Sequence, residues 1–190
     1  MINLNDEQFE NNEVKIFNGG EAGVVKDCAV RIEKKTADDA ENAPAYKLIV
    51  TDDSGAEVNQ GFFDDPDGGS EAAQTFFVKS MKHVAGVFKV QDQLPAQVGS
   101  LKELLDTTMK LCNKNQNNVK VNVAVCYGNE KRPSNYIRID WFWGLKNVED
   151  GIPTLSKTAL TTRPAPDYDG PDIQVGGGAE DAGGVADDWA

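Results

Sequence analysis

The pattern of apolar and polar positions along the chain predicts five strands and two helices. Alternation with a period of two is typical of strands that bury one face, and it recurs five times. The predicted strands are residues 24–33, 45–51, 57–63, 119–127 and 136–143. Two other stretches place an apolar residue every three or four positions, which indicates amphipathic helices. They are residues 70–88 and the stretch that begins at Ser100, where Ser100 and Glu103 form a capping box.

The last predicted strand, 136–143, holds two of the three tryptophans of the chain. Successive side chains of a strand point to opposite faces. We therefore expect one face, directed at the core, to carry Ile137, Ile139, Trp141 and Trp143. The opposite face carries Tyr136, Arg138, Asp140 and Phe142. Two rings and an arginine suit a surface that stacks on a ligand, although a purely structural role in the core is the competing interpretation for most of these aromatic residues.

Three strands, two helices and a final hairpin predict an α+β fold that is mainly β. This order is consistent with an OB-like five-stranded Greek-key barrel with two helices, and another α+β sheet would give the same pattern. We expect an N-terminal arm over residues 1–20, a folded domain over 21–150 and a flexible acidic C-terminal tail over 151–190. Candidate anchors of the arm are Phe9, Val14, Ile16 and Phe17.

The charge of the chain is unevenly distributed. The formal net charge is −12, which by itself argues against a nucleic-acid ligand. Residues 68–148, however, hold 6 acids and 11 bases, a balance of +5, between an N-terminal part at −10 and a C-terminal part at −7. A basic body beside an acidic tail is an informative asymmetry, while acidic surface that merely keeps a protein in solution is the alternative interpretation.

The basic part of the chain offers candidates for contacts with single-stranded nucleic acid. Proteins that bind single strands without sequence preference combine a basic groove with rings on which bases stack. The candidate rings are Tyr127, Tyr136 and Phe142, and the candidate phosphate contacts are Lys120, Lys131, Arg132 and Arg138.

Several other functions lack a signature in the sequence. No catalytic motif is present, and one histidine with three widely spaced cysteines makes no metal-ligand set, so we expect neither an enzyme nor a cofactor or metal. No apolar run approaches the length of a membrane span, and the N-terminus lacks the basic and apolar regions of a signal peptide. We therefore expect a cytoplasmic protein with reduced thiols and no membrane contact.

The C-terminal tail has the most specific composition. From Pro164 onward it contains seven acids and no base, with abundant proline and glycine. Such a segment buries too little apolar surface to fold alone. It nevertheless ends in Asp187-Asp188-Trp189-Ala190, and the large ring of Trp189 suggests contact with a partner.

The layout as a whole resembles the single-stranded DNA-binding proteins of tailed phages. The resemblance is carried by residues 119–127 and 136–143 and by the terminal Asp187-Asp188-Trp189-Ala190. Two features depart from that family: its tip usually ends on phenylalanine, and the first 67 residues are acidic here. The resemblance implies sequence-independent binding of single-stranded DNA in replication or recombination, in the cytoplasm of a bacterial host. It also implies a tail that regulates DNA binding and recruits replication or recombination proteins through Asp187, Asp188 and Trp189, and it leaves room for a homo-oligomer.

Two other functions remain open from the sequence. One is a virion or assembly structural protein that uses the acidic tail as a protein contact. The other is an inhibitor that mimics DNA, in which the acidic surface itself would be active.

Overall fold

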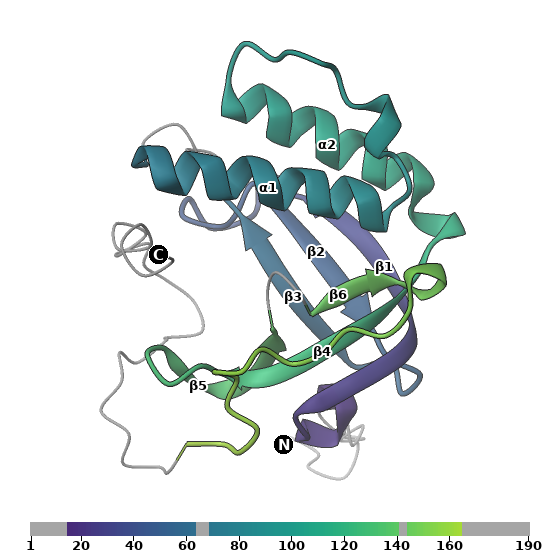
Figure 1. Cartoon of the computed structure of the whole chain (residues 1–190), viewed down its shortest axis with the longest axis vertical. Coiled ribbons are helices and arrows are strands. Elements are labelled where there is room, and N and C mark those ends of the chain that lie inside the picture. The colour runs from purple at the N-terminus through teal and green to yellow at the C-terminus, as the bar shows by residue number, and fades with distance from the viewer. Residues whose placement is uncertain (1–14, 64–68, 141–143, 165–190) are drawn as a thin grey trace, which may run out of the picture.

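The computed structural model describes residues 15–63, 69–140 and 144–164, and it contains six strands and two α-helices within them (Figure 1). The strands are β1 (Gly23–Lys34), β2 (Tyr46–Thr51), β3 (Glu57–Phe62), β4 (Lys120–Gly128), β5 (Pro133–Ile139) and β6 (Leu145–Asn147). The helices are α1 (Glu71–Val87) and α2 (Leu101–Asn115). Short 3-10 turns are η1 (Phe17–Gly20), η3 (Gln91–Gln93), η4 (Gln116–Asn118) and η5 (Val148–Asp150). The predicted α+β class, mainly β, is confirmed.

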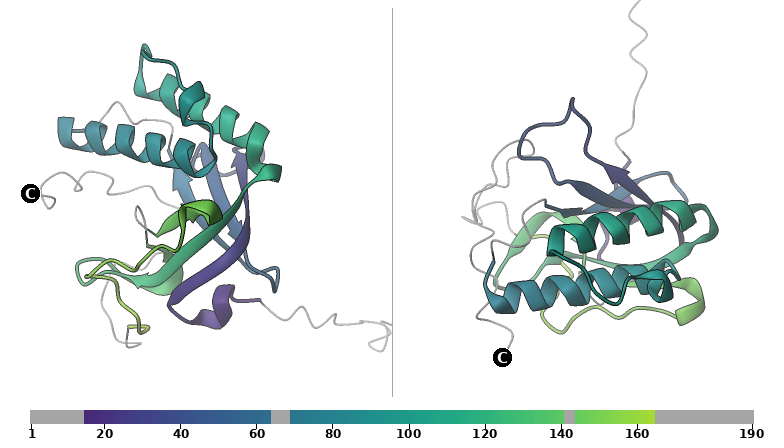
Figure 2. Two further views of the ribbon diagram at one scale, coloured as in Figure 1. Left: turned by 45° about the vertical axis from the view of Figure 1, so that its right-hand side comes forward. Right: turned by 90° about the horizontal axis from the view of Figure 1, so that it is seen from above.

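All strands pair antiparallel in one curved sheet of order β3-β2-β1-β4-β5, with β6 as a second partner of β4. The edge strands β3 and β5 approach each other, but the described residues show no backbone pairing between them. The sheet is therefore open in its hydrogen bonding. The two helices lie side by side at one end of the sheet, and β5 lies at the other end (Figures 1 and 2).

The core lies between the helices and the inner face of the sheet. The helices contribute Met81, Val84 and Phe88 from α1 and its C-terminus, and Leu105 and Met109 from α2, all at 0% exposure. The sheet contributes Leu48, Val50, Val121, Val123, Val125 and Leu145, also at 0%. Both helices begin where a serine side chain caps them: Ser70 Oγ accepts from Ala73 N–H, and Ser100 Oγ accepts from Glu103 N–H.

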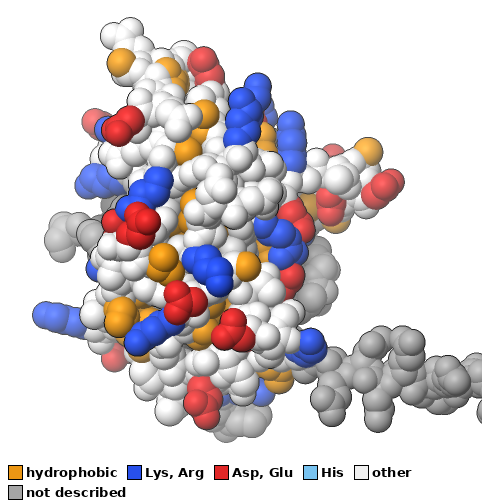
Figure 3. All heavy atoms as spheres, turned by 90° about the vertical axis from the view of Figure 1, so that its right-hand side faces the viewer, with side chains coloured by type: hydrophobic (Ala, Val, Ile, Leu, Met, Phe, Trp, Pro, Cys, Tyr) orange, Lys and Arg blue, Asp and Glu red, His pale blue; other side chains and the backbone are white. Residues whose placement is uncertain are grey.

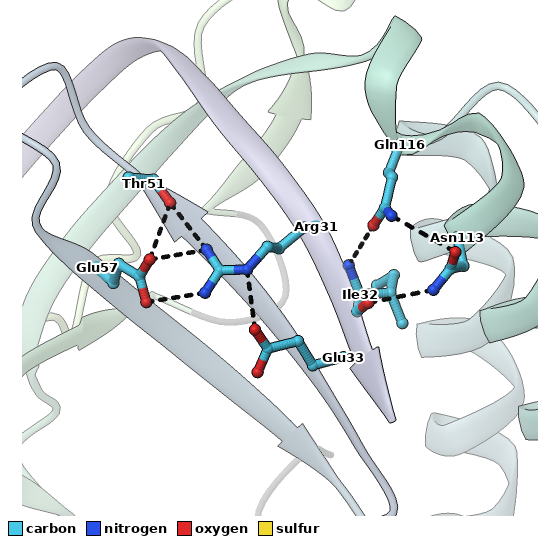
Figure 4. A network of polar contacts seen from close by, with 7 residues as sticks. All are labelled: Arg31, Ile32, Glu33, Thr51, Glu57, Asn113 and Gln116. Atoms are coloured by element: carbon cyan, nitrogen blue, oxygen red, sulfur yellow. Dashed lines mark hydrogen bonds and ion pairs between the residues drawn. The ribbon is translucent and has the colours of Figure 1, made fainter. Parts of the chain in front are cut away.

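Strand β1 extends past the start of β4, and its unpaired edge there is capped by side chains from the last turn of α2 and from η4 (Figure 4). Ile32 N–H donates to Gln116 Oε1 at 2.7 Å, and the Ile32 carbonyl accepts from Asn113 Nδ2 at 3.2 Å. These two amides take the place of a neighbouring strand. They satisfy backbone groups that would otherwise invite pairing with another chain.

The prediction of one continuous strand over residues 136–143 is wrong. Strand β5 ends at Ile139, and β6 begins at Leu145 on the same side of β4. The backbone of Ala124 binds both sides of the break, because its carbonyl accepts from Asp140 N–H at 3.0 Å and its N–H donates to Gly144 O at 2.6 Å. A Cβ at Gly144 would lie 2.3 Å from Asp140 O, so only glycine fits. Trp141, Phe142 and Trp143 lie outside the described residues.

Packed residues extend beyond both ends of the predicted folded domain, which covers residues 21–150. On the N-terminal side, Phe17 is 3% exposed, so this anchor is confirmed, whereas Ile16 is 58% exposed. On the C-terminal side, Tyr127 N–H donates to Leu160 O, and Leu160 N–H donates to Gly128 O, both at 2.9 Å. Packing therefore continues to Leu160, beyond the boundary predicted at residue 150.

The 151–160 segment also explains an error in the face assignment. Asp140 was predicted to point outward, but it is 8% exposed, and its carboxylate accepts from Ser156 N–H at 2.5 Å and Ser156 Oγ at 3.1 Å. Asn122 of β4 is also buried under this segment, and its Nδ2 donates to Gly151 O at 2.9 Å. Strand β4 is thus covered on both faces.

Substitution of Ile139 tests whether the inner face of β5 packs in the core. Ile139 is 3% exposed and packs into the core, so Ile139→Ala is expected to lower the free energy of unfolding by about 2–5 kcal/mol in urea denaturation, since it leaves a cavity. Ile152→Ala is the matched control, because Ile152 is 51% exposed, and it should change stability by no more than about 0.5 kcal/mol. Equal effects of the two substitutions would contradict the assignment of Ile139 to the core.

Candidate nucleic-acid interface

The turn between β4 and β5 presents two of the predicted basic residues, Lys131 and Arg132. The Asn129 side chain fixes its shape, because Asn129 Oδ1 accepts from Lys131 N–H at 3.1 Å and from Arg132 N–H at 2.8 Å. Gly128 makes the close approach of the two strands possible: its φ is +78°, and a Cβ there would lie 2.2 Å from Arg132 O. The backbone of the turn is therefore held in place while the two basic side chains are exposed.

The outer face of β5 adds a ring and a third cation next to this turn. Tyr136 is 57% exposed, and Arg138 is exposed two residues further along the strand. Both therefore project from the same face, as predicted. The Ser134 hydroxyl holds the strand at this point, because it accepts from Tyr136 N–H at 3.1 Å and donates to Tyr136 O at 2.9 Å. We call Lys131, Arg132, Tyr136 and Arg138 together the β5 surface.

Two of the predicted contact residues do not belong to this surface. Lys120 is exposed, but it begins β4 and pairs with Ala29, about 27 Å along the strand from Gly128. Tyr127 is 8% exposed, and its hydroxyl donates to the Gly20 carbonyl, so its ring is packed inside rather than offered for stacking. Phe142 and the tail residues Asp187, Asp188 and Trp189 lie outside the described residues.

The structure adds one basic residue that the sequence pattern missed. Lys157 is exposed and follows Ser156, which binds the Asp140 carboxylate at the end of β5. Two residues later, Ala159 forms a bridge with Asn129 of the β4–β5 turn. Lys157 was overlooked because its segment was assigned to the tail, and no periodicity in the sequence signals the contacts that hold it.

The face that carries β1 has a different electrostatic character. Basic and acidic side chains are intermixed there, and no single sign dominates (Figure 3). Arg31 binds Glu57 through two nitrogens at 2.8 and 3.1 Å and Glu33 at 3.0 Å (Figure 4). The hydrogen bond from Arg31 lowers the pKa of Glu57 below its ordinary value, despite the opposing effect of burial. Arg31 is therefore neutralised within its own sheet.

The cysteines provide no activated nucleophile. Cys28, Cys112 and Cys126 are buried free thiols. Burial raises the pKa of Cys28 to about 11 and that of Cys112 to about 12, and burial together with the nearby Asp140 raises the pKa of Cys126. Each is a protonated thiol at neutral pH.

Within the described ranges, no group of three or more histidine, cysteine, aspartate or glutamate side chains is arranged to hold a metal ion. No helix in that part of the chain is long and apolar enough to cross a bilayer. In the comparisons with known proteins, no family model matches the chain, and neither a curated protein nor a solved structure is significantly similar to it.

Proposed function

We propose that this protein binds single-stranded DNA without sequence preference, through the β5 surface, in phage replication or recombination. The acidic segment from Pro164 onward would regulate that binding and recruit replication or recombination proteins through Asp187, Asp188 and Trp189. The protein acts in this proposal as a binding protein, not as an enzyme.

The arrangement of the strands supports an OB-like barrel as the scaffold. The path β3-β2-β1-β4-β5 becomes a ring if the neighbouring edges of β3 and β5 are taken as its seam. The helices fall between β3 and β4 in the chain. Five strands in a partly open Greek-key barrel characterise the OB fold, whose loop between strands 4 and 5 takes part in oligonucleotide binding. The corresponding turn here carries Lys131 and Arg132.

The observation that carries the proposal is the exposed ring of Tyr136 next to Arg138 and the basic turn. Tyr136 is 57% exposed, so its ring is accessible to a ligand. Stacking of a base on one face of the ring is energetically favourable and costs little desolvation. Stacking tolerates any sequence, since every base has a π-face, and the cations contact phosphates that are common to all nucleotides.

Tyr136 gives the test of this site. Tyr136→Ala is expected to weaken binding of fluorescently labelled oligo(dT), measured by anisotropy, by about 1–3 kcal/mol, which is roughly 5- to 150-fold. Tyr136→Phe keeps the ring and should retain most of the affinity. If Tyr136→Ala binds oligo(dT) as tightly as the unmodified protein, the β5 surface is not the site.

A further inference from the structure

A second feature, independent of nucleic-acid binding, lies where the N-terminal segment meets the sheet. Asn18 is the single asparagine of the chain that is followed by glycine, and two glycines follow it. An asparagine side chain is attacked most readily by the next backbone nitrogen when that residue has no side chain. Asn18 also has an unusual backbone conformation, with φ of 50° and ψ of 30°, in the left-handed region.

Hydrogen bonds hold Asn18 and the nitrogen that follows it in the folded protein. Its N–H donates to Asp52 Oδ2 at 2.9 Å, and its Nδ2 donates to Glu21 O at 2.7 Å. The nitrogen that would attack, Gly19 N, donates to Ile16 O at 2.9 Å. Both reacting groups, the side-chain amide and the following backbone nitrogen, are therefore engaged within residues 16–21, and the bond from Asn18 N–H to Asp52 ties this local structure to the β2–β3 turn.

The attachment of residues 15–20 depends on a small number of contacts. Lys15 Nζ donates to Ser54 O at 2.6 Å, Phe17 is buried, and the Gly20 carbonyl accepts from the Tyr127 hydroxyl. Asp52 is the central acceptor, because it also binds Ser54 N–H, Ser54 Oγ and Ala56 N–H in the β2–β3 turn. Burial works to raise the pKa of Asp52, but these hydrogen bonds together with that from Asn18 N–H outweigh it and lower the pKa, so the group is a carboxylate at neutral pH.

We propose that Asn18 is a site of spontaneous deamidation whose rate is set by detachment of residues 15–20 from the β2–β3 turn. Gly19 N forms a bond to Asn18 Cγ, the Cγ–Nδ2 bond breaks, and ammonia leaves with the proton released from Gly19 N. Water then opens the cyclic succinimide to aspartate or isoaspartate. No oxidant or reductant takes part.

Aspartate or isoaspartate at position 18 disfavours reattachment of residues 15–20 to the β2–β3 turn. A carboxylate at position 18 loses the Nδ2 donor to Glu21 O, so two oxygens face each other at that contact. It also adds a negative charge beside the Asp52 carboxylate. Isoaspartate further lengthens the backbone at the position where Gly19 N meets Ile16 O. Deamidation thus turns a transient detachment into a lasting one.

The rate is measured by mass spectrometry after incubation of the full chain at pH 8. Cleavage after Glu13 and Glu21 yields the peptide 14–21, in which Asn18 is the single amide side chain and gains about 1 Da on conversion. We expect the folded protein to convert most slowly, Asp52→Ala at least about fivefold faster, and the chain in urea fastest; loss of one hydrogen bond corresponds to a factor of about this size. Lys15→Ala, which leaves Asp52 in place, should also accelerate conversion.

The consequence is measured by trypsin cleavage after Lys15, with cleavage after Lys26 in β1 as the internal reference. Asn18→Asp should raise the relative cleavage after Lys15 several-fold, and Asn18→Gln should abolish the mass gain of peptide 14–21. Two results would overturn the proposal: equal conversion rates in the folded protein, in Lys15→Ala and in urea, or absence of conversion at Asn18 in the unfolded chain.

Discussion

Replacing Lys131, Arg132 and Arg138 together with alanine is expected to weaken oligo(dT) binding on the order of a hundredfold at 50 mM salt. The estimate follows from counterion release, in which each phosphate neutralised on a single strand contributes about −0.7 to the slope of log affinity against log salt. Three contacts therefore remove about 2 from the magnitude of the slope. The effect should shrink as salt rises, because the missing contacts are electrostatic.

The helices provide a matched control for this triple variant. Lys79, Lys82 and Lys110 are exposed on α1 and α2, at the end of the molecule opposite to β5 (Figure 1). Replacing these three lysines with alanine changes the net charge by the same amount. We expect that control to keep the salt slope of the unmodified protein. Equal losses in the two triple variants would mean that overall charge governs binding and not the β5 surface.

Truncation after Arg163 is expected to strengthen single-strand binding by roughly tenfold at low salt. Tethering to the body would give the acidic segment an effective concentration of about 1 mM, and a weak internal Kd of about 0.1 mM would then reduce the apparent DNA affinity about tenfold. The point of attachment lies close to the proposed site, because Leu160 binds the backbone of Tyr127 and Gly128 next to the basic turn. The gain should decrease as salt screens the competition.

Trp189→Ala separates the two roles proposed for the tail. It removes a ring but no charge, so DNA affinity should remain close to that of the unmodified protein. Binding of replication or recombination partners should be lost, because an aromatic anchor dominates such contacts while the neighbouring acids steer the encounter. If truncation weakens DNA binding, the tail belongs to the site and does not compete with DNA.

The sequence predicted most elements because their patterns are local. Examples are the alternation in β1 to β4 and the capping box of Ser100 and Glu103 at the start of α2, which each depend on residues a few positions apart. The inward direction of Ile139 and the outward direction of Tyr136 and Arg138 follow from the same period of two. These features do not require knowledge of distant contacts.

The errors arose at positions whose structure is determined by contacts with residues far away in the sequence. The break between β5 and β6 depends on the backbone of Ala124, which binds Asp140 and Gly144. The run of β-forming residues over 136–143 contains no local signal for this break. Asp140 and Asn122 are buried because residues 151–160 fold back over them, and that segment has the composition of a loop. Tyr127 continues the valine pattern of β4, and the same pattern could have indicated that it lies inside.

The most direct test of the central claim is a competition titration of the full chain at 50 mM salt, with oligo(dT) and a duplex of equal length. We expect oligo(dT) to displace bound strand at a much lower concentration than the duplex does, and mixed-sequence single strands to compete about as well as oligo(dT). The affinity should fall linearly with the logarithm of the salt concentration. Absence of oligo(dT) binding, both in the full chain and after truncation at Arg163, would contradict the proposed function.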